Sequence, residues 1–397
     1  MKKRVVALLL AAVMVFALCA CGQKNEPAPE KETEKPTSTE ESKTPAEEPT
    51  PEEEQKTEGF VVGLSNGYWG NTWRAQMVED FETKAKEYVE QGILSDYMVS
   101  NTNSDATEQL NQINAMIDAG VDAILIDAVS PTTVKPAVEK ALAQDILVVI
   151  ANDPAAYEGT ICVCGDNYTW QRIQALWLVE QLEGKGDIVK ITGVSGNSAD
   201  TMREQANDDI LAGYPDINVL AAAPGNWSQT DAQSVMTTYL STYDNIDAVL
   251  EQDVMAEGVL KAYDNAGKVP PIMTGDYTKS FLTKWSQNPD LNTIGVPYAP
   301  GNATVALEVA VRLLQGKELD ESQLRPNPMD ETLVNSIYVE PPYVVTREAQ
   351  PDAPWMEGLK TTKAISLDEA LELLADKADT AALDGYMSEE DVDTLFK

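Results

Sequence analysis

The clearest strand–helix–strand unit of the chain is VDAILIDAVSPTTVKPAVEKALAQDILVVI, residues 121–150. Its two apolar runs, Ala123–Ile126 and Ile146–Ile150, contain no alternating polar residues, which is typical of strands in a parallel sheet that is covered on both faces. Between these runs, Thr132–Ala143 has the apolar periodicity of a helix. A strand, a crossover helix and a second strand form a right-handed βαβ unit, so this stretch predicts an α/β fold.

The same alternation extends through most of the chain after residue 58. On the amino-terminal side we expect strands at Phe60–Leu64 and Tyr97–Val99 and helices at Thr72–Gln91 and Asp105–Ala119. On the other side the expected strands are Asp187–Ile191, Ile217–Ala222, Ala248–Leu250, Pro271–Met273 and Thr293–Val296, and the expected helices are Asp200–Ala212, Thr230–Leu240, Met255–Ala266, Lys279–Ser286 and Ala303–Leu314. About 340 residues exceed what one hydrophobic core normally organises. We therefore predict two doubly wound lobes with a ligand cleft between them.

Residues 1–21 have the features of a bacterial lipoprotein signal. The basic residues at positions 2–4 precede an apolar segment, 5–18, which is too short to span a bilayer comfortably. The segment ends in LCACG at 18–22, and a small residue directly before a cysteine resembles the lipobox, in which that cysteine is lipidated. We expect a signal peptide, a lipidated Cys21, and a mature protein anchored on the outer face of the cytoplasmic membrane. An ordinary secretory signal is the alternative.

Residues 22–58 contain no aromatic and no large aliphatic side chain. They are rich in Glu, Lys, Pro, Thr and Ser, and such a composition cannot bury enough apolar surface to offset the entropy of ordering. We expect a disordered acidic linker, which would serve as a tether or as a spacer without a tuned length.

The composition excludes several classes of function. The formal net charge is -36 at pH 7, which argues against nucleic acid as a partner and against direct binding to an anionic membrane surface. The chain has no histidine, so Ser-His-Asp catalysis, Cys-His catalysis and His-ligated zinc are excluded. Cys162 and Cys164 lie two residues apart on one expected strand, where a disulfide would be strained. We expect buried free thiols, with a disulfide as the alternative, and no metal or other cofactor.

Polar and aromatic side chains follow nearly every predicted strand. Ligands of such sheets lie beyond the carboxyl ends of the strands, which would bring these side chains to one region. The first lobe contributes Ser65, Asn66, Tyr68, Trp69, Asn71, Trp73, Arg74, Asn152 and Asp153, and the second contributes Arg203, Asn226, Trp227, Gln252, Asp253, Asp276, Tyr277 and Tyr298. Aromatic faces cover C–H surface, while carboxylate, amide and guanidinium groups pair with adjacent hydroxyls. This combination is typical of a site for a sugar or polyol.

From this set we predict the ligand-binding residues Ser65, Asn66, Trp69, Asn71, Trp73, Arg74, Asn152, Asp153, Arg203, Trp227, Gln252 and Asp276. Each has a plainer alternative, because Asp and Asn at strand ends also form turns and N-caps. Trp73 lies in a helical stretch and would otherwise belong to the core. We interpret Trp170, Trp177 and Trp285 as structural and Asp127 as a turn or cap residue.

The chain resembles the type I solute-binding proteins of bacterial ABC importers, in their ribose- and galactose-type sugar-binding branch. The resemblance covers residues 60–345 and rests on the order of several motifs, which are VVGLSN at 61–66 with Asn71-Thr72-Trp73, the helix and strand at 106–124, Gly165-Asp166-Asn167, Gln252–Gly258 and Gly275-Asp276. It implies two Rossmann-like lobes joined by a three-stranded hinge. The N-terminal lobe would hold residues 59–165, completed by about 298–335, and the C-terminal lobe would hold residues 166–297, completed by about 336–397.

The same resemblance assigns places in the cleft. It puts Asn71 and Trp73 on the N-terminal wall, Asn152 and Asp153 in place of charged ligand-binding residues, and Arg203, Trp227, Gln252 and Asp276 on the C-terminal wall. The departures from the family pattern are Arg74 in place of an aromatic residue, Asn152-Asp153 in place of Asp-Arg, Val296 in place of Gln, and a helix after Arg203 without its usual glycine. These departures argue against ribose itself and retain a sugar or a sugar-like polyol.

We therefore expect a monomeric, lipid-anchored binding protein, not an enzyme, that closes around a monosaccharide or polyol and delivers it to an ABC transporter permease. Two alternatives stay open, namely a ligand sensor for a receptor kinase and a surface glycan hydrolase that would use Asp253 and Asp276. A DNA-binding regulator is excluded by the signal and by the lack of a basic helix-turn-helix segment. The tail from Gln350 to Lys397 lies beyond the usual end of the family, and we expect it to pack against a lobe.

Overall fold

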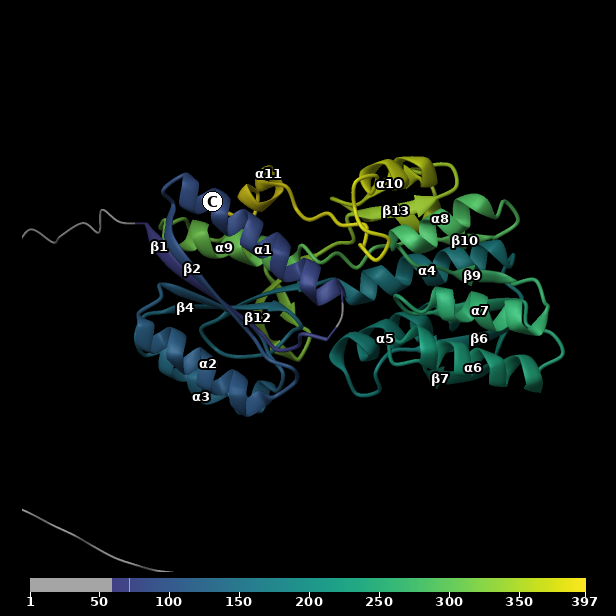
Figure 1. Ribbon diagram of the computed structural model, residues 1–397, viewed down its shortest axis with the longest axis horizontal. Coiled ribbons are helices and arrows are strands. Elements are labelled where there is room, and N and C mark those ends of the chain that lie inside the picture. Colours follow the sequence, from purple (N-terminus) through teal and green to yellow (C-terminus); the bar gives the residue numbers. More distant parts are fainter. Residues whose placement is uncertain (1–58, 71) are drawn as a thin grey trace, which may run out of the picture. The chain divides into compact units, whose positions relative to one another are not determined.

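The computed structural model describes residues 59–70 and 72–397. The predicted signal peptide with Cys21, the predicted linker and Asn71 lie outside the described residues. The rest of the chain forms two α/β lobes, each built on a mostly parallel sheet, which is the predicted fold class (Figure 1). No helix within the described ranges is both long enough and apolar enough to cross a bilayer.

The N-terminal lobe is built on a seven-stranded sheet with the order β11-β12-β5-β4-β3-β1-β2. Its strands are β1 (Phe60–Asn66), β2 (Leu94–Asn101), β3 (Ala123–Asp127), β4 (Leu147–Asn152), β5 (Ile161–Gly165), β11 (Arg325–Asn327) and β12 (Asp330–Val339). Its helices are α1 (Thr72–Glu90), α2 (Ala106–Ala119), α3 (Pro131–Leu142) and α9 (Asn302–Leu314). Only the pair of β11 and β12 is antiparallel among these strands.

Strand β4 explains why the sequence of this lobe lacks polar alternation. Val149 packs into the core beneath α1 and α9, whereas Val148 and Ile150 pack into the core beneath α2 and α3. A strand that is covered on both faces needs an apolar side chain at every position. Cys162 and Cys164 on β5 face the second of these cores and are buried free thiols, as predicted.

The C-terminal lobe is built on a five-stranded parallel sheet with the order β10-β9-β8-β6-β7. Its strands are β6 (Gly186–Thr192), β7 (Ile217–Pro224), β8 (Ala248–Glu251), β9 (Ile272–Thr274) and β10 (Thr293–Ile294). The helices that pack on this sheet are α4 (Asn167–Gln181), α5 (Ser198–Leu211), α6 (Gln229–Thr242), α7 (Ala256–Ala266) and α8 (Lys279–Gln287). One continuous hydrophobic core joins these elements.

The chain passes between the lobes at three hinge crossings. Strand β5 leads into α4, β10 leads into α9, and β12 leads into β13 (Tyr343–Thr346), which pairs with the C-terminal lobe through Val345 and Gly295. Because β12 ends at Val339, the N-terminal sheet takes a few more residues than the expected segment 298–335.

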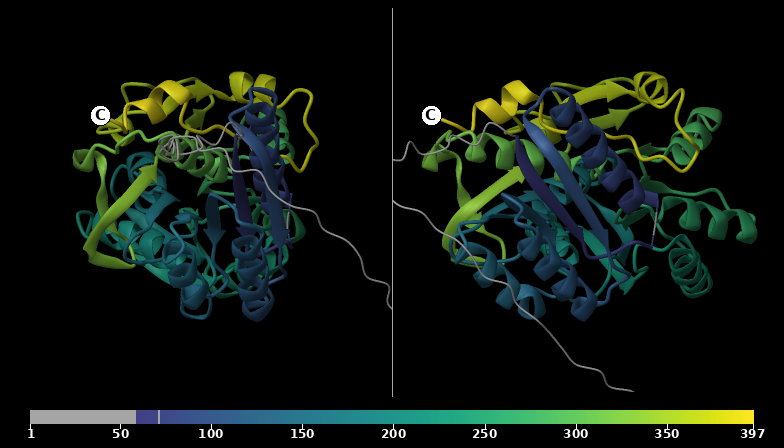
Figure 2. Two further views of the ribbon diagram at one scale, coloured as in Figure 1. Left: turned by 90° about the vertical axis from the view of Figure 1, so that its left-hand side faces the viewer. Right: turned by 60° about the vertical axis from the view of Figure 1, so that its left-hand side comes forward.

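The tail after β13 departs from the expected division between the lobes. Strand β14 (Lys363–Ser366) and helix α10 (Leu367–Leu373) pack on the C-terminal lobe. Helix α11 (Glu389–Asp393) instead packs against α9 of the N-terminal lobe, and the tail runs along both lobes in Figures 1 and 2. Residues 336–397 therefore complete both lobes, because Val392 and Leu395 are apolar and enter the N-terminal core. Short 3₁₀ turns lie at Glu321–Gln323 and Pro354–Met356.

Candidate functional site

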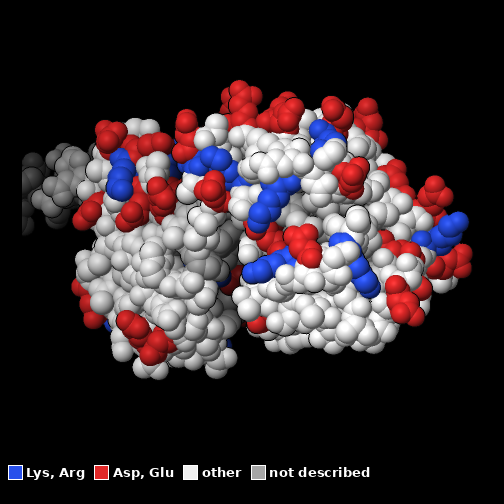
Figure 3. Space-filling view, turned by 45° about the vertical axis from the view of Figure 1, so that its right-hand side comes forward, with Lys and Arg blue, Asp and Glu red and all other residues white. Residues whose placement is uncertain are grey.

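A cavity of about 570 Å³ lies between the two lobes. Its walls come from the loops that follow β1, β3, β4, β6, β7 and β8, so it lies at the carboxyl ends of the strands. Parallel register brings these ends together, as where Asn66 of β1 lies beside Asp127 of β3. A space-filling view shows the hollow between the lobes and no extended basic patch on the same face (Figure 3). The volume is within the usual range for small-molecule sites.

Six predicted residues are brought together at this cavity, which are Trp73, Arg74, Asn152, Asp153, Arg203 and Trp227. Ser65, Asn66, Trp69, Gln252 and Asp276 are absent from its walls. Asp127, Asn226, Asp253 and Tyr298 also line the cavity, although we had not predicted them as ligand-binding residues. Three of these four had appeared in the wider set of residues at strand ends.

Trp73, in the first turn of α1, is held against the second hinge crossing. Its ring stacks on Tyr298 with 5.7 Å between the ring centroids, and its indole N–H donates to the Tyr298 carbonyl at 2.7 Å. Trp73 also packs against the cores of both lobes while it lines the cavity. Trp73 therefore belongs to the core and also lines the cavity, and its contact with ligand stays a prediction.

Arg74 is held by two carboxylates of its own lobe. Its guanidinium donates to Asp127 and, at 2.8 Å, to Asp153. Our interpretation of Asp127 as a turn or cap residue is wrong, because Ser130 caps α3 and the Asp127 carboxylate pairs with Arg74. Asp127 is 2 % exposed, so the ion pair of Arg74 and Asp127 is the buried part of the N-terminal wall. Asp153 lies nearer to solvent.

Asn152 ends β4 in the left-handed conformation, with φ of 64°, which Asn adopts more readily than most residues. The residue is 1 % exposed, and its Oδ1 atom has no hydrogen-bond partner among the described residues. A buried amide oxygen without a partner is costly, by about 1–3 kcal/mol. At a cavity wall, a ligand that donates a hydrogen bond to this oxygen would remove the cost.

Arg203, on α5, is the most enclosed charged group of the cavity and is 1 % exposed. Its Nε donates to Asn167 at 2.9 Å, and its Nη1 donates to Asp253 at 3.1 Å. The guanidinium carbon lies 4.2 Å from the ring centroid of Trp170 and 4.9 Å from that of Tyr298. Aromatic faces and directed hydrogen bonds hold the guanidinium in one orientation.

Trp227 lies on the loop after β7, where it and Asn226 both have a positive φ. Its indole N–H donates to Gln252 at 3.4 Å. Gln252 is buried and donates in turn to Asp200 and Glu204, both at 3.0 Å. The predicted contact between Gln252 and ligand is therefore replaced by a supporting role behind Trp227.

Three predicted residues of the first loop serve the fold or the surface. Ser65 is buried and accepts a hydrogen bond from Gln109, and Asn66 is buried and donates to Asn101 at 2.8 Å. Ser65 thus connects β1 to α2 and Asn66 connects β1 to the end of β2, and neither lines the cavity. Trp69 is 47 % exposed and also lies outside the cavity walls. The prediction for these three residues differs from the structure because a position after a strand does not determine which way the side chain points.

Asp276 was expected on the C-terminal wall but is fully buried in its own loop. Its carboxylate accepts from the backbone N–H of Tyr277 at 2.6 Å and from that of Thr278 at 3.3 Å. Burial raises the pKa of Asp276 to about 7, against the effect of these hydrogen bonds. Asp253 takes the expected place at the cavity, where it accepts from Arg203 and from the hydroxyl of Tyr277. The sequence could have identified Asp253 as a cavity residue, because it lies in the loop directly after the buried strand β8.

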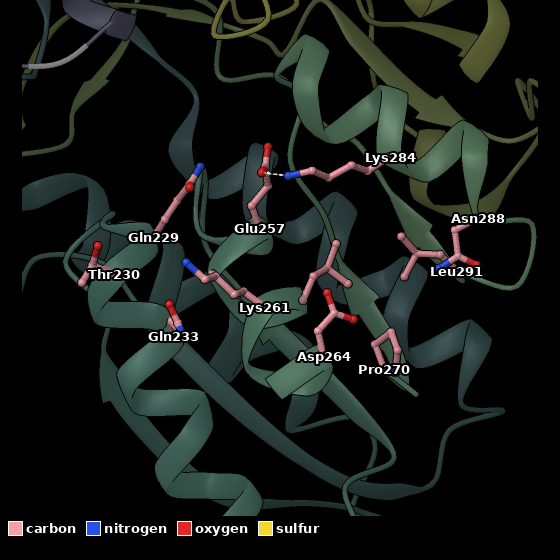
Figure 4. A pocket seen from close by; sticks show the side chains of 12 residues that line it. Gln229, Thr230, Gln233, Glu257, Lys261, Asp264, Pro270, Lys284, Asn288 and Leu291 are labelled. Carbon is pink, nitrogen blue, oxygen red and sulfur yellow. Dashed lines mark hydrogen bonds and ion pairs between the residues drawn. The ribbon is translucent and has the colours of Figure 1, made fainter. Parts of the chain in front are cut away.

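A second depression, here called the outer groove, lies on the C-terminal lobe alone and has a volume of about 620 Å³. Most of its lining residues come from α6, α7 and α8, and Lys284 points toward Glu257, with which it forms an ion pair (Figure 4). No aromatic side chain is among its lining residues in the described part of the chain. The cavity between the lobes combines aromatic faces with buried polar groups, so we assign the candidate site there.

Comparison with known proteins is consistent with this architecture. Residues 62–318 match the family model described as periplasmic binding protein domain. The xylitol-binding protein of Mycolicibacterium smegmatis is 33 % identical over 182 residues, which is 44 % of this chain and 51 % of that protein. The chain thus spans about half the length of this curated relative. The ribose import binding protein of Bacillus subtilis is 26 % identical over 67 % of this chain and 86 % of its own.

Solved structures of similar proteins have the same two-lobed fold. An ABC transporter solute binding protein from Thermobispora bispora has a TM-score of 0.62 and 26 % identity, and the match covers 81 % of this chain and 98 % of that chain. An ABC transporter solute binding protein from Bacillus halodurans with bound myo-inositol has a TM-score of 0.59 and 22 % identity, over 72 % of this chain and 94 % of that chain. The expected type I fold is confirmed by these likenesses.

Proposed function

Because the chain belongs to the periplasmic binding protein domain family, we propose that it is the substrate-binding protein of an ABC importer. It captures a neutral sugar or polyol in the cavity between its lobes and delivers this ligand to an ABC transporter permease. It acts as a monomer, without a cofactor, outside the cytoplasmic membrane, to which a lipid on Cys21 anchors it. Ligand shifts the protein toward a closed arrangement in proportion to its differential affinity for that arrangement.

The observation that carries this proposal is Asn152, which lines the cavity and whose buried Oδ1 atom has no hydrogen-bond partner in the described chain. A ligand hydroxyl is a donor of the right kind, and the aromatic rings of Trp73, Trp227 and Tyr298 line the same cavity. Such rings cover the C–H faces of a sugar or polyol, while the amide and carboxylate groups satisfy its hydroxyls.

The charges of the cavity favour a neutral ligand. Arg74 is paired with Asp127 and Asp153, and Arg203 is paired with Asp253. An anionic ligand would have to compete with these carboxylates for the guanidinium groups, and a cationic ligand would have to compete with the arginines. Hydroxyl groups donate to the carboxylates and accept from the guanidinium groups without breaking the pairs. Xylitol and ribose, for which two relatives are named, belong to this neutral, polyhydroxylated class.

The hydrolase alternative loses one of its two carboxylates. Asp253 lines the cavity, but Asp276 is fully buried and bonded to its own backbone. A glycosidase needs two carboxyl groups on either side of the bond that is cut, and of the expected pair only Asp253 is at the cavity. A receptor-kinase sensor would use the same cavity, and no feature of the described residues favours it over transport.

The test is a thermal-shift screen of the full chain against monosaccharides, polyols, amino acids and nucleosides. A ligand that binds only the folded state raises the melting temperature with its concentration. We expect a sugar or polyol to do so, and Asn152→Gly to abolish the shift without straining the backbone, since Gly accepts a positive φ. Asp145→Gly is the matched control, because Asp145 is exposed, has φ of 57° and lies outside the cavity. A shift with amino acids or nucleosides alone would contradict the proposed ligand class.

The anchoring proposal has a separate test on the first residues of the chain. We expect Cys21→Ala to move the protein from the membrane fraction to the soluble fraction, whereas Cys19→Ala in the same segment leaves it anchored. Membrane association of the Cys21→Ala variant would contradict a lipid on Cys21 and would leave the binding proposal intact.

A further inference from the structure

Tyr277 is a buried residue that contacts the wall of the cavity without lining it. It follows β9 in the chain and is among the residues at strand ends that we did not predict to bind ligand. The side chain is fully buried, and Tyr277 is absent from the cavity walls. Its hydroxyl donates to Oδ1 of Asp253, which does line the cavity. Any effect of this hydroxyl on a ligand must therefore act through Asp253.

The carboxylate of Asp253 is held at both oxygens. Oδ1 accepts from the Tyr277 hydroxyl, and Oδ2 accepts from Nη1 of Arg203 at 3.1 Å. A carboxylate oxygen can accept more than one hydrogen bond, so each oxygen retains a lone pair for a ligand hydroxyl. The Asp253 side chain is 15 % exposed, so it borders the open part of the cavity. The two donors fix the orientation of a carboxylate that would otherwise be free to rotate toward water.

The main chain of Tyr277 is itself bonded on two sides. Its N–H donates to the Asp276 carboxylate at 2.6 Å, and its carbonyl accepts from the N–H of Leu383 in the tail at 2.8 Å. The next residue, Thr278, forms an antiparallel bridge with Ala382 of the tail. The Tyr277 ring packs in the core of the C-terminal lobe. Tyr277 therefore offers Asp253 a rigid support.

The tail makes a fourth passage between the lobes directly after this contact, in addition to the three hinge crossings. Asp384 accepts from the backbone N–H of Gly301 at 3.0 Å, and Val392 enters the core of the N-terminal lobe. Figure 1 shows the tail in yellow between α10 and α11. This passage lies outside the segment that matches the family model. The segment that supports Tyr277 is thus held by both lobes.

The Tyr277 hydroxyl stays a hydrogen-bond donor through neutral pH. Burial, and then the charge of Asp253, raise the pKa of the Tyr277 hydroxyl well above its ordinary value. A neutral hydroxyl fixes the carboxylate without cancelling its charge. Asp253 can therefore still pair with Arg203 and accept from the hydroxyls of a ligand.

We propose that Tyr277 is a positioning residue of the cavity, which holds the Asp253 carboxylate in the orientation that accepts hydrogen bonds from a polyol. The class of ligand in this proposal rests on the proposed function. A side chain that is fixed before ligand arrives does not have to be ordered on binding, and that ordering otherwise costs affinity. Tyr277→Phe removes only the hydroxyl, and we expect it to weaken binding by about threefold to tenfold.

Hydrogen–deuterium exchange of the full chain without ligand tests the support of Asp253. We expect residues 253–255 to exchange faster in Tyr277→Phe than in the wild type. Tyr263→Phe is one control, because the buried Tyr263 hydroxyl has no partner in the described chain. Tyr239→Phe is the matched control, because the hydroxyl of buried Tyr239 donates elsewhere, to the Lys190 carbonyl at 3.2 Å. Unchanged exchange in Tyr277→Phe, or an equal increase in Tyr239→Phe, would overturn the proposal.

Isothermal calorimetry with xylitol and with myo-inositol, the compounds named for two similar proteins, tests the effect on binding. We expect Tyr239→Phe to keep the wild-type affinity and Tyr277→Phe to lose it. The loss should disappear in an Asp253→Ala background, where the hydroxyl has no carboxylate to hold. Full affinity in Tyr277→Phe, or the same fractional loss in both backgrounds, would overturn the proposal. The exchange experiment needs no ligand, so it decides the support of Asp253 even if the wild type binds neither polyol and the proposed ligand class fails.

Discussion

Arg74 and Arg203 line the same cavity from opposite lobes, but they are held in different ways. Arg203 is almost completely enclosed, with a side chain 2 % exposed, and it lies against aromatic rings and donates to Asn167 and Asp253. Arg74 has a side chain 12 % exposed and is held by two carboxylates, of which Asp153 is 29 % exposed. The C-terminal wall is thus built into the core of its lobe, whereas the N-terminal wall is an ion-paired surface that borders solvent.

The difference indicates that the two walls contribute to ligand binding in different ways. A group that is fixed by stacking and directed bonds before ligand arrives costs little further ordering when it binds. A group at the edge of the cavity retains more freedom and more water, so it contributes less to stability. We expect the C-terminal wall to behave as a rigid template and the N-terminal wall to adjust as the lobes close.

Replacement of Arg203 should have the largest effect. Arg203→Met removes the only charged partner that Asp253 has among the described residues, and it removes the group that lies against the rings of Trp170 and Tyr298. Breaking a buried pair typically costs about 3–5 kcal/mol, so we expect a clear loss of unfolding free energy and of ligand-induced stabilisation. Denaturant unfolding measures the first and the thermal-shift screen measures the second. A stability equal to that of the wild type would mean that the C-terminal wall is not a template.

Replacement of Arg74 should have a smaller effect on stability. Arg74→Met leaves Asp127 buried beside an apolar side chain, but Asp153 can turn to solvent. We expect a loss of about 1–3 kcal/mol, which is the cost of leaving a buried polar group without a partner. The same denaturant titration provides the comparison with Arg203→Met. A loss as large as that of Arg203→Met would remove the distinction between the two walls.

Trp227→Ala separates ligand contact from fold stability on the C-terminal wall. The ring is only partly buried, so its removal should change the melting temperature little. We expect at least about a tenfold loss of affinity, or 1.4 kcal/mol, for the compound that the screen identifies. Isothermal calorimetry with that compound measures the loss. If the variant lost as much unfolding free energy as binding free energy, Trp227 would be a core residue and not a ligand-contacting residue.

Asp276→Asn should have the smallest effect and should leave affinity unchanged, because Asp276 bonds to its own loop. Its raised pKa has a consequence for stability. The stabilisation is complete below the ordinary pKa of an aspartate and is lost as pH rises through about 7. The gain in melting temperature from Asn should therefore grow as pH rises between these two values and level off above about pH 7. Melting curves across this range check the direction. A weaker affinity of the Asp276→Asn variant for ligand would mean that Asp276 takes part in ligand binding after all.

The site could be predicted to the level of the loop but not of the side chain. Asn152 and Asp153 were identified because they follow a buried strand, and both line the cavity. Ser65 and Asn66 satisfy the same rule, yet they bind Gln109 and Asn101 instead. A position directly after a strand places a residue at the correct edge of the sheet. Whether its side chain lines the cavity or bonds to a neighbouring element depends on the residues packed beside it in the tertiary structure.

The sequence by itself determined the two-lobed α/β fold, because uninterrupted apolar strands and amphipathic helices are local patterns that burial on both faces requires. It also excluded histidine-based chemistry and indicated a polar, aromatic cavity. Only the tertiary structure decided that Arg74 pairs with Asp127, 53 residues away, and that Asp384 binds Gly301, 83 residues away. Those contacts join segments whose own patterns carry no information about one another, so packing of the complete chain sets the cavity walls and the fourth passage between the lobes.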